Sequence, residues 1–145
     1  MGNAVGAALR KGSGVVLDFF GDARSAIKNG VSVDPKAVSG FRGTIAEFAE
    51  QFGGTVDKIV ANGPQTEFLN EASQLLESGG SLIINATKGN KFGKLPPAER
   101  LKELGFRVVQ QAGELLDEFK GTTFRRTNGS VIPTESVRST VLEKL

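Results

Sequence analysis

The sequence contains no cysteine, histidine, tryptophan or tyrosine. Without cysteine there are no disulfides, thiolate metal sites or cysteine nucleophiles, and without histidine there is no imidazole base or ligand. Any chemistry therefore depends on carboxylates, amides, hydroxyls, lysine, arginine or the backbone, and we predict no metal site. No apolar run approaches the roughly 18 residues that cross a bilayer, and no secretory signal is recognisable, so we also predict no membrane span.

What the sequence does contain is the composition of a folded domain. Hydrophobic residues make up 39% and charged residues 23% of the 145 residues, which suffices for one hydrophobic core. The first residues are rich in glycine and alanine, and we predict a linker at 1–13 followed by a single domain at 14–145. The net charge of +2 is only a weak bias toward nucleic acid, so composition leaves the partner open.

The segment from residue 13 to residue 34 organises the rest of the chain. Its apolar run at 15–20 predicts a strand buried on both faces of a parallel sheet. A glycine turn follows, then a helix-compatible segment at 23–28 and a second strand at 30–33 that ends on Asp34. In such βαβ units the acid after the second strand accepts hydrogen bonds from ribose hydroxyls. We therefore predict Asp34 as a ribose ligand, the alternative being an ordinary βαβ unit without a ligand.

The remaining chain alternates strand and helix patterns and then becomes β-rich. Strand and helix patterns overlap at 41–52, where Thr44 and Glu47 have the spacing of a capping box. The Asn128-Gly129 pair predicts a hairpin over 122–132. Further strands are predicted at 56–61, 81–86, 106–110 and 137–142, and further helices at 66–76 and 96–105. This order indicates an α/β fold that is parallel first and antiparallel at its end.

Several short motifs follow one another along the chain: VVLDFFGD at 15–22, VSVDP at 31–35, VDKIVANGP at 56–64, LLESGGSLIINA at 75–86 and LKELGFRVVQQ at 101–111. In this order they resemble the motifs of the class I S-adenosylmethionine-dependent methyltransferases over about residues 14–132. The resemblance implies a three-layer Rossmann-like sheet, mostly parallel with an antiparallel C-terminal hairpin. It also implies S-adenosylmethionine as cofactor.

The resemblance assigns roles to individual residues. The positions implied to bind the cofactor are Asp18, Gly21, Asp22, Asp34 and Glu47, and those implied at the transfer site are Asn62 and Pro64. The sequence departs from the family in that Phe20 and Asp22 stand where glycine is usual, and Gln65 stands where an aromatic residue would stack on the substrate. The helices that usually precede the first strand are also missing.

Two functions from different classes follow. The first is a methyltransferase that acts on a nitrogen or oxygen of a small-molecule or nucleic-acid acceptor, with Lys88, Lys91 and Lys94 either holding phosphates or forming a solvated loop. The alternative is a C-terminal effector or toxin domain of a larger secreted bacterial protein. Such a domain would act on RNA or nucleotides in the cytoplasm, for example as a nuclease-type toxin, and an immunity protein would neutralise it.

Overall fold

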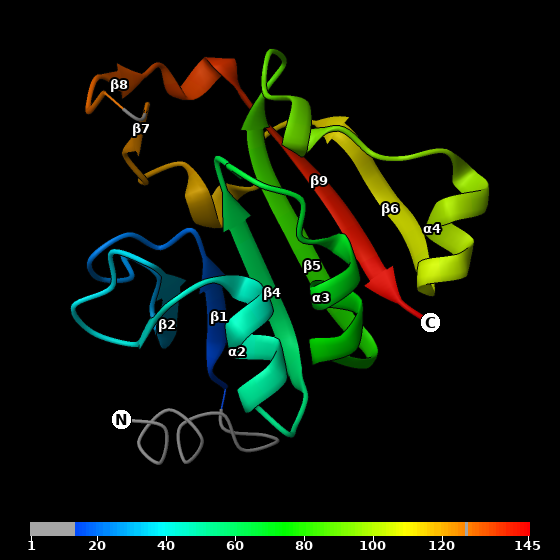
Figure 1. Cartoon of the computed structure of the whole chain (residues 1–145). Coiled ribbons are helices and arrows are strands. Elements are labelled where there is room, and N and C mark those ends of the chain that lie inside the picture. The colour runs from blue at the N-terminus through cyan, green and yellow to red at the C-terminus, as the bar shows by residue number, and fades with distance from the viewer. Residues whose placement is uncertain (1–13, 127) are drawn as a thin grey trace.

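The computed structural model describes residues 14–126 and 128–145, so the predicted linker at 1–13 and Thr127 of the predicted hairpin lie outside the described residues. Seven strands form one sheet in the order β3-β2-β1-β4-β5-β9-β6 (Figure 1). The strands are β1 (Val16–Phe19), β2 (Gly30–Asp34), β3 (Phe41–Arg42), β4 (Val56–Asn62), β5 (Leu76–Thr87), β6 (Phe106–Gly113) and β9 (Val137–Lys144).

The sheet is parallel from β3 to β5, and β9 runs antiparallel between β5 and β6. The chain builds outward from β1 in one direction through β2 and β3, and in the other through β4 and β5. The strand order therefore reverses between β1 and β4, and open α/β sheets bind ligands at the carboxyl edge of such a switch point.

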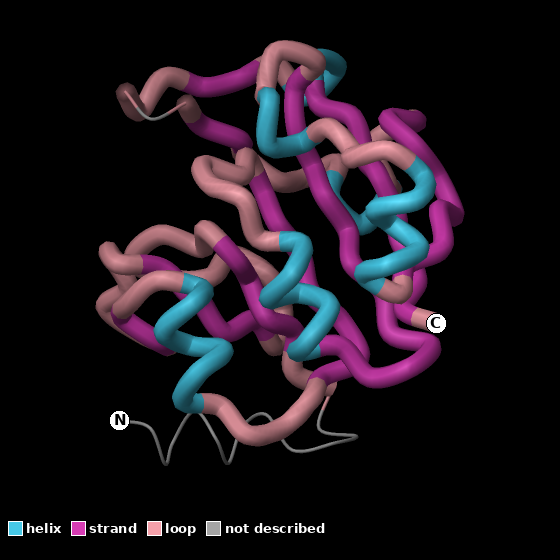
Figure 2. The backbone as a smooth tube through the Cα atoms, turned by 45° about the vertical axis from the view of Figure 1, so that its right-hand side comes forward, coloured by secondary structure: helices cyan, strands magenta, loops and turns pink. Residues whose placement is uncertain are grey.

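One face of the sheet carries the α-helices α2 (Ile45–Gln51), α3 (Leu69–Leu75) and α4 (Ala98–Leu104), which lie along one side of the strands in Figure 2. Phe48, Ala72 and Leu101 of these helices pack against Phe19, Ile59 and other buried strand residues in the larger hydrophobic cluster. None of the described helices is long and apolar enough to cross a membrane.

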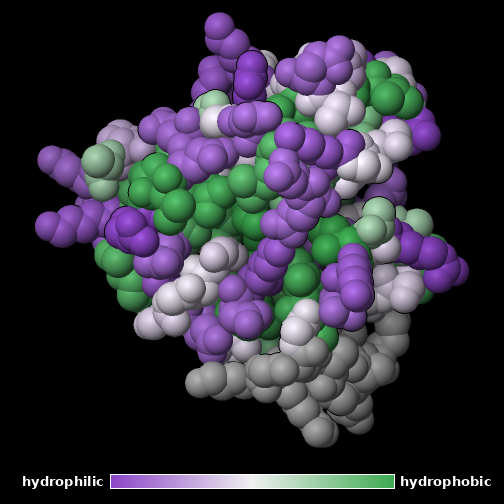
Figure 3. All heavy atoms as spheres, turned by 180° about the vertical axis from the view of Figure 1, so that it is seen from behind, coloured by the Kyte–Doolittle hydropathy of each residue, from purple (hydrophilic) through white to green (hydrophobic). Residues whose placement is uncertain are grey.

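The other face is covered by residues 115–137 in place of α-helices. This segment contains the 3-10 helices η2 (Asp117–Phe119) and η3 (Thr134–Ser136) and the hairpin strands β7 (Phe124–Arg125) and β8 (Val131–Ile132). A second cluster joins Phe119 and Phe124 to Val16, Val60 and Ile83 of the sheet. Figure 3 views the molecule from behind and shows apolar side chains reaching the surface between polar ones.

Local signals account for several element boundaries. The overlapping patterns at 41–52 separate into β3 and α2, because Thr44 forms the predicted capping box: its hydroxyl accepts from the Glu47 amide, and the Glu47 carboxylate accepts from the Thr44 amide. Gly105 ends α4 at a φ of 82°. The Asn128-Gly129 hairpin forms as predicted, with β7 and β8 paired antiparallel.

Two sequence-based predictions of secondary structure were wrong. Residues 23–28 form turns where we predicted a helix, because the Ser25 hydroxyl donates to Asp18 and accepts from the Ile27 amide, and the Ala23 carbonyl accepts from the loop at 38–39. The strand predicted at 81–86 begins at Leu76, directly after α3, because Leu76 pairs with Val56 and the register is irregular before Ser81 pairs with Lys58.

Candidate cofactor and transfer site

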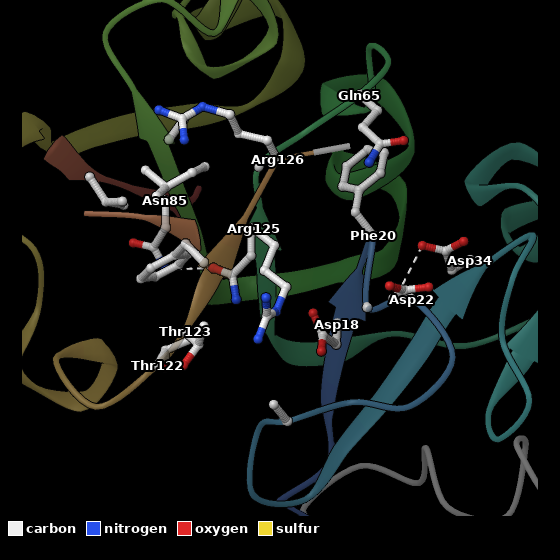
Figure 4. Close-up of a pocket in the computed structure, with 18 of the residues that line it drawn as sticks. Asp18, Phe20, Asp22, Asp34, Gln65, Asn85, Thr122, Thr123, Arg125 and Arg126 are labelled. Atoms are coloured by element: carbon white, nitrogen blue, oxygen red, sulfur yellow. Dashed lines mark hydrogen bonds between the residues drawn. The ribbon is translucent and has the colours of Figure 1, made fainter. Parts of the chain in front are cut away.

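A cavity of about 310 Å³, the central cavity, lies at the carboxyl ends of β1, β2, β4 and β5 (Figure 4). Its wall combines the loop after β1, the segment after β4, the end of β5 and the β7–β8 hairpin. The hairpin thus closes the side of the switch point that the α-helices leave open. The volume lies within the range of small-molecule sites.

The loop after β1 has the backbone of a glycine-rich turn, although Gly21 is its single glycine. Phe20 and Asp22 have φ values of 64° and 58°, in the left-handed region that glycine favours. Between them, a Cβ added at Gly21 would lie 2.7 Å from the Ser32 hydroxyl and 2.9 Å from the Asp18 carboxyl. Phe20 and Asp22 therefore adopt a backbone conformation that glycine favours, and such backbone strain is typical of functional sites.

The Phe20 ring helps to hold this conformation. It lies edge-on to the ring of Phe68, with the two centroids 5.7 Å apart, and Phe19 contacts the same ring at 6.2 Å. Phe20 also lines the central cavity, so an apolar ring stands beside the carboxylates.

Asp34, the predicted ribose ligand, lies at the end of β2 and lines the central cavity. One carboxylate oxygen accepts from the Asp22 amide at 3.0 Å and the other from the Lys36 amide at 2.8 Å. A carboxylate offers about four acceptor positions, so further donors can bind. Asp34 therefore ties the two loops together and retains the capacity to accept hydrogen bonds from a ligand.

Asp18 is the buried acid of the site. Its side chain is 3% exposed, and its carboxylate accepts from the Ser25 hydroxyl at 2.7 Å. Burial raises the pKa of Asp18 to about 6; the Ser25 hydrogen bond opposes this increase and the nearby Asp34 charge adds to it. Asp18, Gly21, Asp22 and Asp34 all line the central cavity, so the structure brings these four predicted residues together.

Asn62 is held by a chain of hydrogen bonds that sequence reasoning missed. The Leu116 amide donates to the Ser139 hydroxyl, which donates to the Asn85 carbonyl oxygen at 2.6 Å. The Asn85 amide in turn donates to the Asn62 side-chain oxygen at 2.7 Å. Asn85 and Ser139 are fully buried, and the polar asparagine within the apolar segment SLIINA was the available signal.

Pro64 and Glu47 occupy different positions from the other predicted residues. Pro64 is buried and is not among the residues lining the central cavity, and its carbonyl accepts from the Asn90 side chain at 3.0 Å. Glu47 is exposed on α2, away from the cavity lining, and its hydrogen bonds with Thr44 lower its pKa. The observed role of Glu47 is to cap the helix.

Cations line the central cavity together with the acids. Arg24, Lys36, Arg125 and Arg126 line the cavity, and none of the ion pairs between described residues involves the three aspartates. Figure 4 shows Arg125 and Arg126 extending in different directions from the hairpin, Arg125 on the side of Asp18. Over residues 14–126 and 128–145, no group of three or more carboxylates is arranged to hold a metal ion.

Comparison with solved structures identifies the fold. The chain resembles the antibiotic-resistance methyltransferase Kmr with a TM-score of 0.58 and 14% identity, over 100% of this chain and 94% of that one. It resembles TrmN from Thermus thermophilus with a TM-score of 0.50 and 20% identity, over 99% of this chain but 48% of TrmN. Neither a protein-family model nor a curated protein matches the sequence. The predicted Rossmann-like α/β fold is confirmed, and it is the fold of class I methyltransferases.

Proposed function

We propose that this chain binds S-adenosylmethionine in the central cavity and transfers its methyl group to a nitrogen or oxygen of an acceptor. The observation that carries the proposal is the juxtaposition of Asp34, at the end of β2, with a glycine-like loop at 20–22, at the end of β1. Both stand at the switch point of a sheet with the methyltransferase strand order.

The residues at this point fit the cofactor. Asp34 would accept hydrogen bonds from the ribose hydroxyls, and the backbone of the loop at 20–22 would lie against the methionine part. Asp18 and Asp22 would offset the positive charges of the cofactor. When bound, the cofactor would supply an electrophilic methyl group to a lone pair of the acceptor. The sulfur would keep the electrons of the broken carbon–sulfur bond, and the acceptor proton would go to water.

Asn62 would orient the acceptor beside the cofactor. Its side-chain oxygen is fixed by Asn85 and has a second lone pair that can accept from an amino or hydroxyl group. A direct displacement needs the acceptor held close and in line, so a rigid amide contributes through orientation, and no histidine base is required.

Calorimetric titration with S-adenosylmethionine and S-adenosylhomocysteine tests the proposal. We expect micromolar binding to the wild-type chain. Binding to Asp34→Ala should be weaker by about a hundredfold or more, because two hydrogen bonds to a charged group are lost. Asp57→Ala, at an exposed position at the start of β4, is the matched control and should bind normally. Thermal melting of each variant checks that it is folded.

Absence of binding to the wild-type chain at millimolar ligand would overturn the cofactor assignment. Full affinity in Asp34→Ala would remove Asp34 from it. The effector or toxin alternative, with its immunity protein, stays a prediction from the sequence.

A further inference from the structure

A second cavity adjoins the central cavity and has a different electrostatic character. It has a volume of about 520 Å³ and shares Ala86, Thr87 and Asn90 with the central cavity. Its charged lining residues are Lys88, Lys94 and Arg138, and no carboxylate lines it. We call the surface formed by these three cations the basic groove.

The three cations come from two segments far apart in the sequence. Lys88 and Lys94 belong to the loop after β5. Arg138 is the second residue of β9 and pairs with Ala86 of β5. All three side chains are exposed. Lys91 of the same loop lies over the ring of Phe92 at 5.0 Å and is not among the residues that line the groove. The groove therefore contains two of the three lysines of the loop, and the pairing of β9 with β5 adds Arg138 to them.

Within residues 14–126 and 128–145, no carboxylate pairs with the cations of the basic groove. Elsewhere in the described chain, cations do have such partners: Lys58 lies 2.7 Å from Glu118, and Arg107 lies 2.9 Å from Glu143. Unpaired cations around a concave surface attract anions and focus their field there.

The cations continue around the mouth of the central cavity. Arg125 and Arg126 each use one guanidinium nitrogen to donate to a hairpin carbonyl, of Gly129 and Val131, and their other nitrogens can still donate. Cations therefore line two adjoining cavities rather than a single point. An anion with several phosphates along a chain could contact both groups, and arginine and lysine recognise phosphates of this kind.

We propose that the basic groove binds the phosphate backbone of a single-stranded nucleic acid whose methyl-accepting nucleotide enters the central cavity. The accepting base or ribose would then meet Asn62, which lines the central cavity. A single strand is expected because an enzyme must take its target base out of the stack before acting on it. The identity of the acceptor rests on the proposed methyltransferase function, whereas binding to the groove does not.

Fluorescence anisotropy with labelled single-stranded RNA and DNA of about 16 nucleotides tests the binding without any cofactor. The groove variant carries Lys88→Gln, Lys94→Gln and Arg138→Gln. The control variant carries Lys28→Gln, Arg100→Gln and Lys102→Gln, three exposed positions outside both cavities, and loses the same charge. Calorimetry with S-adenosylmethionine on all three proteins reports separately on the central cavity.

We expect wild-type and control proteins to bind the strands with low micromolar affinity. The groove variant should bind roughly tenfold or more weakly, and its slope of log affinity against log salt should fall by about 2, since each phosphate contact on a single strand contributes about 0.7. A preference for RNA or DNA identifies the acceptor strand. Cofactor affinity should be equal in the groove variant and the wild type.

Three results would overturn the proposal. The first is no nucleic-acid binding by the wild type at low salt, and the second is an equal loss in the groove and control variants, which would mean that only net charge matters. The third is displacement of the strands by polyglutamate as readily as by unlabelled nucleic acid. If strands bind but S-adenosylmethionine does not, the methyltransferase function fails and the groove assignment stands.

Discussion

The buried carboxyl group of Asp18 makes stability depend on pH in a defined direction. Burial raises the pKa of Asp18 from 3.8 to about 6, so the folded state holds this proton more tightly than the unfolded state. The free energy of unfolding contributed by this group is therefore present below about pH 4 and is lost as the pH rises to about 6. Asp18→Asn removes the titration and keeps an oxygen that can accept the Ser25 hydroxyl.

The magnitude follows from the two pKa values. The difference between 3.8 and about 6 corresponds to about 3 kcal/mol of unfolding free energy. Relative to the wild type, Asp18→Asn should become more stable by about this amount between about pH 4 and pH 7, and the difference should not change further at higher pH. Any packing cost of the amide adds a constant that does not depend on pH.

Urea denaturation of both proteins at a series of pH values measures this difference, because a shift in midpoint at constant m-value reports a change in stability. Asp57→Asn, exposed at the start of β4, is the matched control and should follow the wild type at every pH. A difference between Asp18→Asn and the wild type that stays flat, or shrinks as the pH rises, would refute the claim that the folded protein bears the cost of an ionised, buried Asp18.

Two further substitutions test the loop and the cap. Gly21→Ala should destabilise the fold by about 1–3 kcal/mol and weaken cofactor binding, because the added Cβ would lie within 3 Å of Asp18. The control Gly53→Ala should do neither, because an added Cβ there would have nothing within 4 Å. Equal melting temperatures of the two variants would contradict this prediction. Thr44→Ala should cost about 1 kcal/mol by removing one half of the capping box with Glu47, and unchanged urea midpoints would show that the cap is not stabilising.

Sequence patterns predicted those parts of the fold that local interactions determine. The cap at Thr44, the glycine end of α4 at Gly105 and the Asn128-Gly129 hairpin each depend on residues a few positions apart, and all three are present. The helix predicted at 23–28 was wrong because its helical spacing competes with a tertiary contact, the hydrogen bond from Ser25 to the buried Asp18.

The candidate site was predictable only in part, for the same reason. Asp18, Asp22 and Asp34 lie within one βαβ-like segment, so the motif places them at one edge of the sheet. Glu47 satisfied two patterns at once, a cap and an acidic position of the family, and the structure uses it in the cap. The basic groove could not be predicted from the lysine-rich loop alone, because Arg138 joins it through strand pairing.

The position of β9 explains why the proposed acceptor contact at Asn62 depends on segments far apart in the sequence. Asn85 pairs in register with Asn62 on one side and with Ser139 on the other, so inserting β9 beside β5 brings a hydroxyl to the one buried asparagine of that strand. Without this hydroxyl the Asn85 carbonyl oxygen would be buried and unsatisfied, which costs about 1–3 kcal/mol. Because the Ser139 hydroxyl is itself fixed by the Leu116 amide, the orientation of Asn62 depends on residues up to 77 positions away along the chain, from Asn62 to Ser139. The antiparallel strand therefore both extends the sheet and orients the amide that we propose holds the acceptor.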